Sequence, residues 1–337
     1  MGRAEVVFVL AVAGHGCGGG PGSTAGAPVA AAPAVAASAA SSAAPTLRPA
    51  ATIRLSGSTA SGVAEANGWL WVTHFEASVL SQVDPRTGAE VGLVEIGANA
   101  GSLTAIGLQL WVAQYTTRPE DARLVHVDSL TATVRRRVPL PHLCCEVAGA
   151  GGRIWAVDPR AALLAIDPDG GGVVSSTPVA IDPAVHIGLF GDERALWVSS
   201  DTTALLRVDP QSARVIATLD VGGGIPMALA HDLVWGASPH HVWAVDPASN
   251  EVRVRLPIEN TIEVLSLAVT EDALWIGARR PGYVGVVLRY DLRSGHLTGE
   301  AAVGLPAKVL YAFGRVWIVD WDTNTLLGFD DATSRID

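Results

Sequence analysis

An apolar–tryptophan–apolar triplet recurs seven times along the chain at nearly constant spacing. Each triplet begins with Leu, Ile or Val, and the central residues are Trp71, Trp111, Trp155, Trp197, Trp235, Trp275 and Trp317. Successive tryptophans are 40, 44, 42, 38, 40 and 42 residues apart. An aspartate turn follows each of them by 11 to 17 residues, at Asp84, Asp128, Asp167, Asp209, Asp246, Asp291 and Asp330. A register kept over seven units indicates an internal structural repeat.

Each unit predicts four short β-strands. A strand of small apolar residues, such as 103–106, precedes the Trp strand. A third strand ends at the aspartate turn, and a fourth follows it, as in 134–140, 214–221 and 252–257. A period of about 41 residues with four strands per unit is typical of a β-propeller blade. We therefore predict an all-β fold, a seven-bladed β-propeller with four antiparallel strands in each blade.

The two ends of the repeat region predict how the ring closes. The last unit stops at "DDATSRID", where its fourth strand should begin, and residues 52–55 form an orphan strand before the first unit. If this N-terminal strand completes the last blade, residues 51–337 supply 41 residues to each of seven blades and leave no open sheet edge. The repeated tryptophans should then pack between blades, and each aspartate should cap its turn. Trp69, Trp243 and Trp321 lie outside the repeat.

The N-terminal region has a different composition. Residues 1–17 contain Arg3, an apolar run at 6–13, small residues and Cys17, which is the pattern of an export signal. Cys17 and the three glycines after it resemble a bacterial lipoprotein site, so Cys17 is the candidate for lipidation. An untargeted tail and a misassigned start codon are the alternatives. Residues 18–50 are nearly all Ala, Gly, Pro and Ser and predict a disordered tether, and residues 51–337 form the propeller.

The segments "LWVTH…VLSQVDPRTGAEVGLVEIG" and "ALWVSS…LLRVDPQSARVIATLDVG" resemble the exported YVTN-type (YncE-like) bacterial propellers, and the resemblance covers residues 51–337. It implies an exported binding or interaction module. We expect no cofactor, and we favour binding over catalysis. The related virginiamycin B lyase family shares the seven-bladed plan and uses Glu and His residues with Mg²⁺. Its Glu-x-His pattern is missing from the last blades of this sequence. Because this pattern is missing, we rank a metal-dependent lyase or hydrolase acting at the channel mouth second, as the alternative to a binding module.

Charge narrows the choice of partner. The formal net charge is −10, the wrong sign for neutralising a phosphate backbone, so we expect no nucleic-acid partner. A small molecule or a protein remains as the partner, and the membrane would be reached only through the lipid anchor. We expect a monomer that is exported to the periplasm or the cell surface.

The mouth of the central channel is the default ligand site. It lies on the face that carries the fourth-to-first and second-to-third strand loops. Counting back from each repeat tryptophan, the channel-mouth positions are Gly62, Ser102, Glu146, Gly188, Pro226, Ser266 and Lys308. Polar neighbours are His142, Cys144, His186 and Glu263. A charge near the axis is costly unless it is paired or ligated, which singles out Glu146 and Lys308. Solvated rim residues and a mutual salt bridge are the simpler interpretations.

The segment "PHLCCEV" is the densest cluster of metal-ligating residue types. In an extended strand His142, Cys144 and Glu146 point to one side, and His186 of the next blade offers a fourth ligand. No second ligand pair at a known metal spacing accompanies them. A strained disulfide between Cys144 and Cys145 is another option, and buried free thiols are the simplest interpretation.

Two further groups complete the candidate site. His74 and Asp320 end the second strands of the first and last blades, which are neighbours in the ring, so they could form a base with its orienting carboxylate or a polar rim contact. Blades 2 and 6 have longer loops that contain Arg118, Arg279 and Arg280. Together with Lys308 these arginines would attract an anionic ligand, unless nearby carboxylates such as Glu263 cancel their charge. Solvated loop variation is the alternative.

Overall fold

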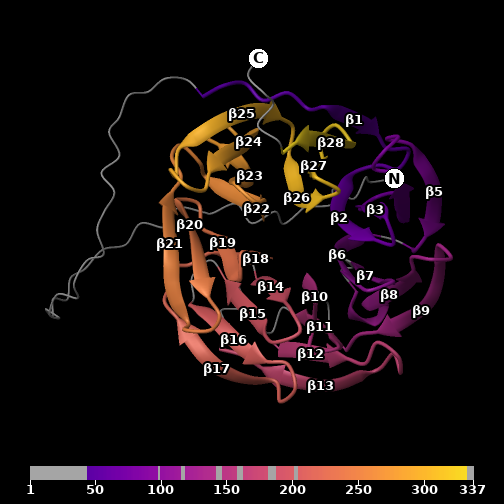
Figure 1. Ribbon diagram of the computed structural model, residues 1–337. Helices are drawn as coiled ribbons and strands as arrows, with labels where there is room; N and C mark the ends of the chain where they lie inside the picture. Colours follow the sequence, from indigo (N-terminus) through magenta and orange to yellow (C-terminus); the bar gives the residue numbers. More distant parts are fainter. Residues whose placement is uncertain are drawn as a thin grey trace, which may run out of the picture. The chain divides into compact units, whose positions relative to one another are not determined.

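The computed structural model describes residues 44–331 except 98, 115–117, 142–145, 158–161, 181–186 and 201–203, and it leaves the side chains of 119, 200, 226 and 227 undescribed. The described residues form seven four-stranded antiparallel sheets, which are the blades of the propeller (Figure 1). The seven-bladed β-propeller predicted from the repeat is confirmed.

The strands follow the order of the sequence from the channel outward. Blade 1 contains β2 (Ala60–Ala66), β3 (Trp69–His74), β4 (Val79–Val83) and β5 (Glu90–Glu95). Blade 2 contains β6 (Ala100–Ile106), β7 (Gln109–Gln114), β8 (Arg123–Asp128) and β9 (Thr133–Pro139), with a short 3-10 helix, η1 (Pro119–Asp121), between β7 and β8. Blade 3 contains β10 (Glu146–Ala150), β11 (Arg153–Val157), β12 (Ala162–Ile166) and β13 (Val173–Pro178). Blade 4 contains β14 (Ile187–Gly191), β15 (Leu196–Ser200), β16 (Leu205–Asp209) and β17 (Arg214–Leu219).

Blade 5 contains β18 (Ile225–Ala230), β19 (Leu233–Ala237), β20 (His241–Asp246) and β21 (Glu251–Pro257). Blade 6 contains β22 (Glu263–Val269), β23 (Ala273–Arg280), β24 (Val284–Asp291) and β25 (Leu297–Val303). Blade 7 contains β26 (Pro306–Ala312), β27 (Arg315–Asp320), β28 (Thr325–Asp330) and, as its outermost strand, β1 (Ala51–Arg54). The extra residues of blade 6 lengthen the β23–β24 hairpin, whereas those of blade 2 include η1.

The N-terminal strand closes the ring as predicted. In β1, Ile53 pairs with Leu326 of β28 in antiparallel register. Contacts with the propeller begin before residue 51, within the segment expected to be a tether. Glu300 of β25 exchanges backbone hydrogen bonds with this segment, accepting from Leu47 N–H at 2.7 Å and donating to the Pro45 carbonyl at 2.9 Å. Leu47 also packs on the hydrophobic cluster between blades 6 and 7, so the N-terminal chain contacts both blades.

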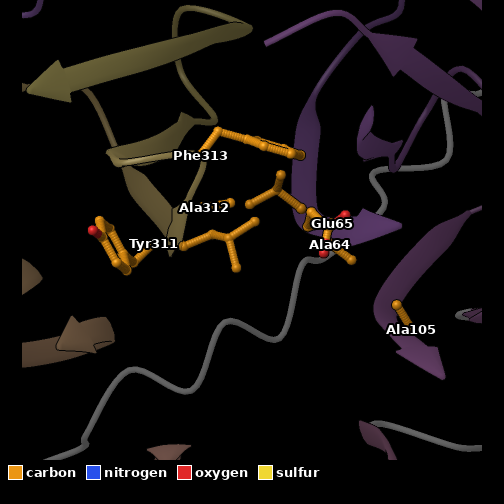
Figure 2. Close-up of a pocket in the computed structure, with 8 residues that line it drawn as sticks. Ala64, Glu65, Ala105, Tyr311, Ala312 and Phe313 are labelled. Carbon is orange, nitrogen blue, oxygen red and sulfur yellow. The ribbon is translucent and has the colours of Figure 1, made fainter. Parts of the chain in front are cut away.

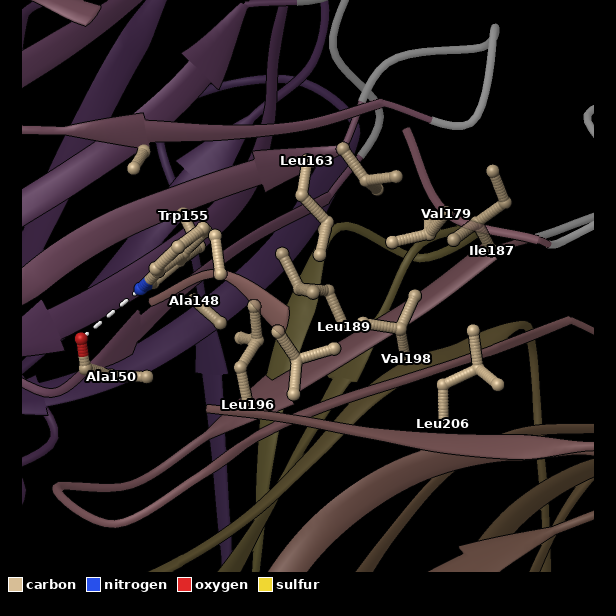
Figure 3. Close-up of a cluster of buried hydrophobic side chains, with 14 residues drawn as sticks. Ala148, Ala150, Trp155, Leu163, Val179, Ile187, Leu189, Leu196, Val198 and Leu206 are labelled. Atoms are coloured by element: carbon tan, nitrogen blue, oxygen red, sulfur yellow. Dashed lines mark hydrogen bonds between the residues drawn. The ribbon is translucent and has the colours of Figure 1, made fainter. Parts of the chain in front are cut away.

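The repeat residues have the structural roles that the sequence predicts. All seven repeat tryptophans are buried, and Trp155 of blade 3 packs with Leu196 and Val198 of blade 4 (Figure 3). Its indole N–H donates to the carbonyl of Ala150, five residues earlier, at 3.1 Å. The indole N–H groups of Trp71, Trp235 and Trp317 donate to the equivalent carbonyls in their own blades. Six turn aspartates accept backbone N–H bonds within their own turns: Asp84, Asp128, Asp167, Asp209, Asp246 and Asp291. The Asp330 carboxylate accepts from Arg315, and the residues after 331 lie outside the described part of the chain.

No helix in the described part of the chain is both long and apolar enough to span a membrane.

Candidate functional site

The predicted channel-mouth positions all lie in the innermost strands of the blades. These seven strands contact one another in a closed circle, β2 to β6 and onward to β26 and back to β2 (Figure 1). Each inner strand runs from the mouth, where Lys308 lies near the start of β26, to the opposite end of the channel. We call that opposite end the base, and the turns between first and second strands surround it.

The two candidate serines connect neighbouring blades. The Ser102 hydroxyl donates to a Glu146 carboxylate oxygen at 2.9 Å and accepts the N–H of Val147 at 3.3 Å. The Ser266 hydroxyl accepts the N–H of Val309 at 3.0 Å. Both hydroxyls therefore hold adjacent inner strands together. Lys308 is half-buried opposite Val319.

The candidate arginines are all in ion pairs. Arg279 contacts Glu263 at 2.9 Å, and these two residues are direct partners in the β22–β23 register. Arg280 contacts Glu300 at 2.6 Å, and Arg118 contacts Asp121 at 2.5 Å. Because each guanidinium lies beside a carboxylate, these residues add no excess positive charge to the mouth.

His74 and Asp320 take part in separate hydrogen-bond networks. His74 is fully buried, its Nε2 lies 2.7 Å from the Ser81 hydroxyl, and Ser81 donates to Glu90 at 2.5 Å. Burial lowers the pKa of the His74 imidazole, which favours its neutral form. Asp320 is buried too, and its carboxylate accepts the N–H groups of Gly304 at 2.9 Å and Leu305 at 3.2 Å. This arrangement orients loops at the closure of the ring and does not pair a base with an acid.

Several candidates lie outside the described residues: Cys17, His142, Cys144 and His186. Among the residues that are described, no three His, Cys, Asp or Glu side chains form a group that could hold a metal ion.

A pocket at the base of the channel was not predicted. Its volume is about 470 Å³, and its walls come from β2, from β6 and from the end of β26 with the turn that follows it. Figure 2 shows Phe313 extending from blade 7 toward β2, where Ala64 and Glu65 lie. Tyr311 is 41 % exposed and Phe313 is 48 % exposed. The signal in the sequence was Phe313, four residues before the repeat tryptophan, where the other six units have Asn, Gly, Glu or His. Tyr311 two residues earlier adds a second aromatic side chain.

Acidic side chains line or surround the base pocket. Glu65 lines it, and its carboxylate accepts the N–H of Gly68 at 3.3 Å. Partial burial, together with the negative charges of Asp331, Glu271 and Asp272, raises the pKa of the Tyr311 hydroxyl. Two of these acids have partners, because Asp331 accepts the Trp275 indole N–H and Asp272 lies 3.5 Å from Arg289. The base thus combines exposed apolar side chains with negative charge.

The fold places the chain among seven-bladed β-propellers of known structure. Hydrazine synthase of Kuenenia stuttgartiensis superposes with a TM-score of 0.65 at 14 % identity, over 83 % of this chain and 97 % of that one. BamB from Moraxella catarrhalis superposes with a TM-score of 0.61 at 11 % identity, over 85 % of this chain and 100 % of that one. The sequence matches no protein-family model and no curated protein. At these identities the likeness shows the fold alone.

Proposed function

We propose that this chain is an exported propeller of the YncE-like kind, anchored through a lipid on Cys17, that binds a protein partner at the base pocket. The observation that carries this proposal is the exposed aromatic pair Tyr311 and Phe313 beside a pocket of about 470 Å³. Exposed aromatic side chains at a concave surface are the usual anchors of protein interfaces.

The charge around the base pocket defines the chemistry of the partner. Glu65 and Glu271 form no ion pair with the described basic residues, and Asp331 and Asp272 add to the negative field that raises the pKa of Tyr311. A complementary segment would place an aliphatic or aromatic side chain against Phe313 and a Lys or Arg side chain near Glu65. We therefore propose a basic segment with an apolar anchor as the occupant.

Site-specific photo-crosslinking of the full chain in intact bacteria tests the interaction. A benzophenone amino acid replaces Phe313 in one variant and Tyr283 in the matched control, because Tyr283 is also exposed but lies in the blade 6 hairpin turn on the mouth side. We expect one dominant crosslinked protein at position 313 and none at 283, with the crosslinked peptide containing Lys or Arg. Adding Glu65→Lys should weaken the crosslink. No crosslink at 313, or the same products at both positions, would refute the base as the docking site.

Fractionation of the same cells tests the anchor separately. The full chain should sediment with membranes, and Cys17→Ser should move it to the soluble exported fraction or leave its leader uncleaved. An unchanged distribution together with an unchanged mass, which shows that the leader was still removed, would contradict lipidation while leaving the crosslinking result to decide the interaction.

A further inference from the structure

One position of the repeat differs between blades, and in blade 2 a second pocket lies beside it. This position is the third-strand residue that pairs with the repeat tryptophan. In blade 4 it is Arg207, whose guanidinium lies over the Trp197 ring at 5.4 Å. The same side chain donates to the Pro247 carbonyl at 2.5 Å and to the Asn250 amide oxygen at 2.9 Å. An arginine at this position therefore fills the space between its own blade and the turn of the next one.

Blade 2 has His126 at this position. The imidazole stacks on Trp111 with ring centroids 4.6 Å apart and an interplanar angle of 10°. Its Nε2 atom is buried and has no hydrogen-bond partner among the described residues. A pocket of about 400 Å³ lies beside it between blades 2 and 3, and we call it the His126 pocket. The residues that matter for its chemistry are Leu108, Asp128, Arg135, Arg136, Pro168 and Asp169.

Four charged side chains line the His126 pocket, two basic and two acidic, and only one basic and one acidic group form an ion pair with each other. Arg135 and Asp128 satisfy each other, with the guanidinium donating to one carboxylate oxygen at 2.7 and 3.0 Å. Arg136 donates only to the backbone carbonyl of Asp169, at 2.6 Å, and forms no ion pair within the described part of the chain. The Asp169 carboxylate likewise accepts no hydrogen bond from a described residue. Burial and the neighbouring Arg136 lower the pKa of His126, so the imidazole is neutral at pH 7 and the lining charges balance.

A guanidinium and a carboxylate that both retain bonding capacity, in one pocket with zero net charge, match a ligand with both signs of charge. Part of the remaining lining is apolar: Leu108, which is 50 % exposed, and Pro168 of blade 3 line the pocket together with Gln109 and His126. We propose that the His126 pocket binds an aliphatic α-amino acid. Its carboxylate would contact Arg136, its ammonium group Asp169, and its side chain Leu108 and Pro168. This site is separate from the base pocket and does not depend on the proposed interaction there.

Titration calorimetry on the full chain tests the ligand class with three probes that share the isobutyl side chain of leucine. L-Leucine carries both charges, 4-methylpentanoate only the carboxylate and isopentylamine only the ammonium. We expect L-leucine to bind and each single-charge analogue to bind at least about tenfold more weakly, because each loses one charged contact. No heat of binding with L-leucine, or equal affinity for 4-methylpentanoate, overturns the proposal.

Four variants test the location of the site. His126→Arg introduces the residue that blade 4 has at this position, so it should fill the pocket and abolish leucine binding in a folded protein. Asp169→Asn should weaken binding at least about tenfold and leaves the backbone hydrogen bonds of the turn in place. Arg136→Gln should weaken it similarly. Arg137→Gln is the matched control, since Arg137 is exposed on the same strand but does not line the pocket. Melting temperatures of all four confirm folding, and leucine binding retained by His126→Arg or Asp169→Asn refutes the site.

Discussion

Removal of the closing strand is the sharpest perturbation of this fold. A truncation that begins at Gly57 deletes β1 and the contacts of residues 45–50, whereas a truncation that begins at Ala44 leaves both in place. The two proteins differ only in residues 44–56, so the comparison isolates ring closure from any effect of the N-terminal 43 residues.

The structure sets the size of the effect. Ile53 and Leu55 are 6 % and 7 % exposed and belong to the cluster that joins blades 7 and 1. Burial of each side chain contributes about 1.5–3 kcal/mol. The hydrogen bonds of β1 with β28 and the bond from the Asn324 amide to the Leu55 carbonyl at 3.0 Å add about 1 kcal/mol each. The sum is at least about 5 kcal/mol, which is a large share of the 5–15 kcal/mol typical of folded domains.

Guanidinium denaturation followed by tryptophan fluorescence measures this difference. We expect the protein that begins at Ala44 to unfold at the denaturant concentration of the full chain, and the protein that begins at Gly57 to unfold at a much lower one or not to fold at all. A third protein that begins at Ala51 should lie between them if the contacts of Leu47 stabilise blade 6. Coincident transitions for the Ala44 and Gly57 proteins would refute ring closure by β1 as a source of stability.

Three further predictions concern residues with a defined structural role. Trp155→Ala should cost about 3–5 kcal/mol in denaturant unfolding, and Trp69→Ala, at a partly exposed position, should cost less; equal costs would contradict the inter-blade role of the repeat tryptophan. Burial lowers the pKa of His74, so the native state loses stability as the pH falls through about 6.5, the value in the unfolded chain. His74→Gln should therefore show a flatter melting temperature between pH 7 and 5, and an identical pH profile would count against this. Bonds from Arg135 and the turn N–H groups hold the pKa of Asp128 at about 2, so Asp128→Asn should remove stability that wild type keeps at neutral pH and loses between about pH 4 and 2. A variant as stable as wild type at pH 7 would exclude that contribution.

The repeat made the fold predictable. The tryptophans and aspartates perform the same task in nearly every blade, so each unit supports the interpretation of the others. The orphan strand at 52–55 was predictable for the same reason, because one blade lacked a strand and one strand lacked a blade. The contacts of residues 45–47 with β25 were not, because a stretch rich in Ala and Pro has no pattern that indicates a partner.

The candidate site was harder to predict because its residues act in pairs between strands. The Glu263–Arg279 ion pair follows from the β22–β23 register and could have been derived from the hairpin. The bond from Ser102 to Glu146 connects separate blades, and nothing in either unit alone indicates it. Most of the polar candidate residues at the mouth form such contacts. The exposed apolar residues at the base were not among the predicted site residues.

Differences between equivalent positions are therefore more informative about function here than the shared pattern. The position opposite the repeat tryptophan is Arg207 in blade 4 and Arg289 in blade 6, and both guanidinium groups lie over the tryptophan ring. At the same register blade 2 has His126, with a buried nitrogen that lacks a partner and a pocket beside it. Blades 3, 5 and 7 have Ala165, Ala244 and Gly328 at this register, so the length of this side chain does not by itself set the space. In blade 2 the pocket also depends on the residues around His126, such as Arg136 and Asp169. The same comparison at the first turn sets Phe313 of blade 7 against Asn67 of blade 1, and there too the departure from the repeat marks a pocket.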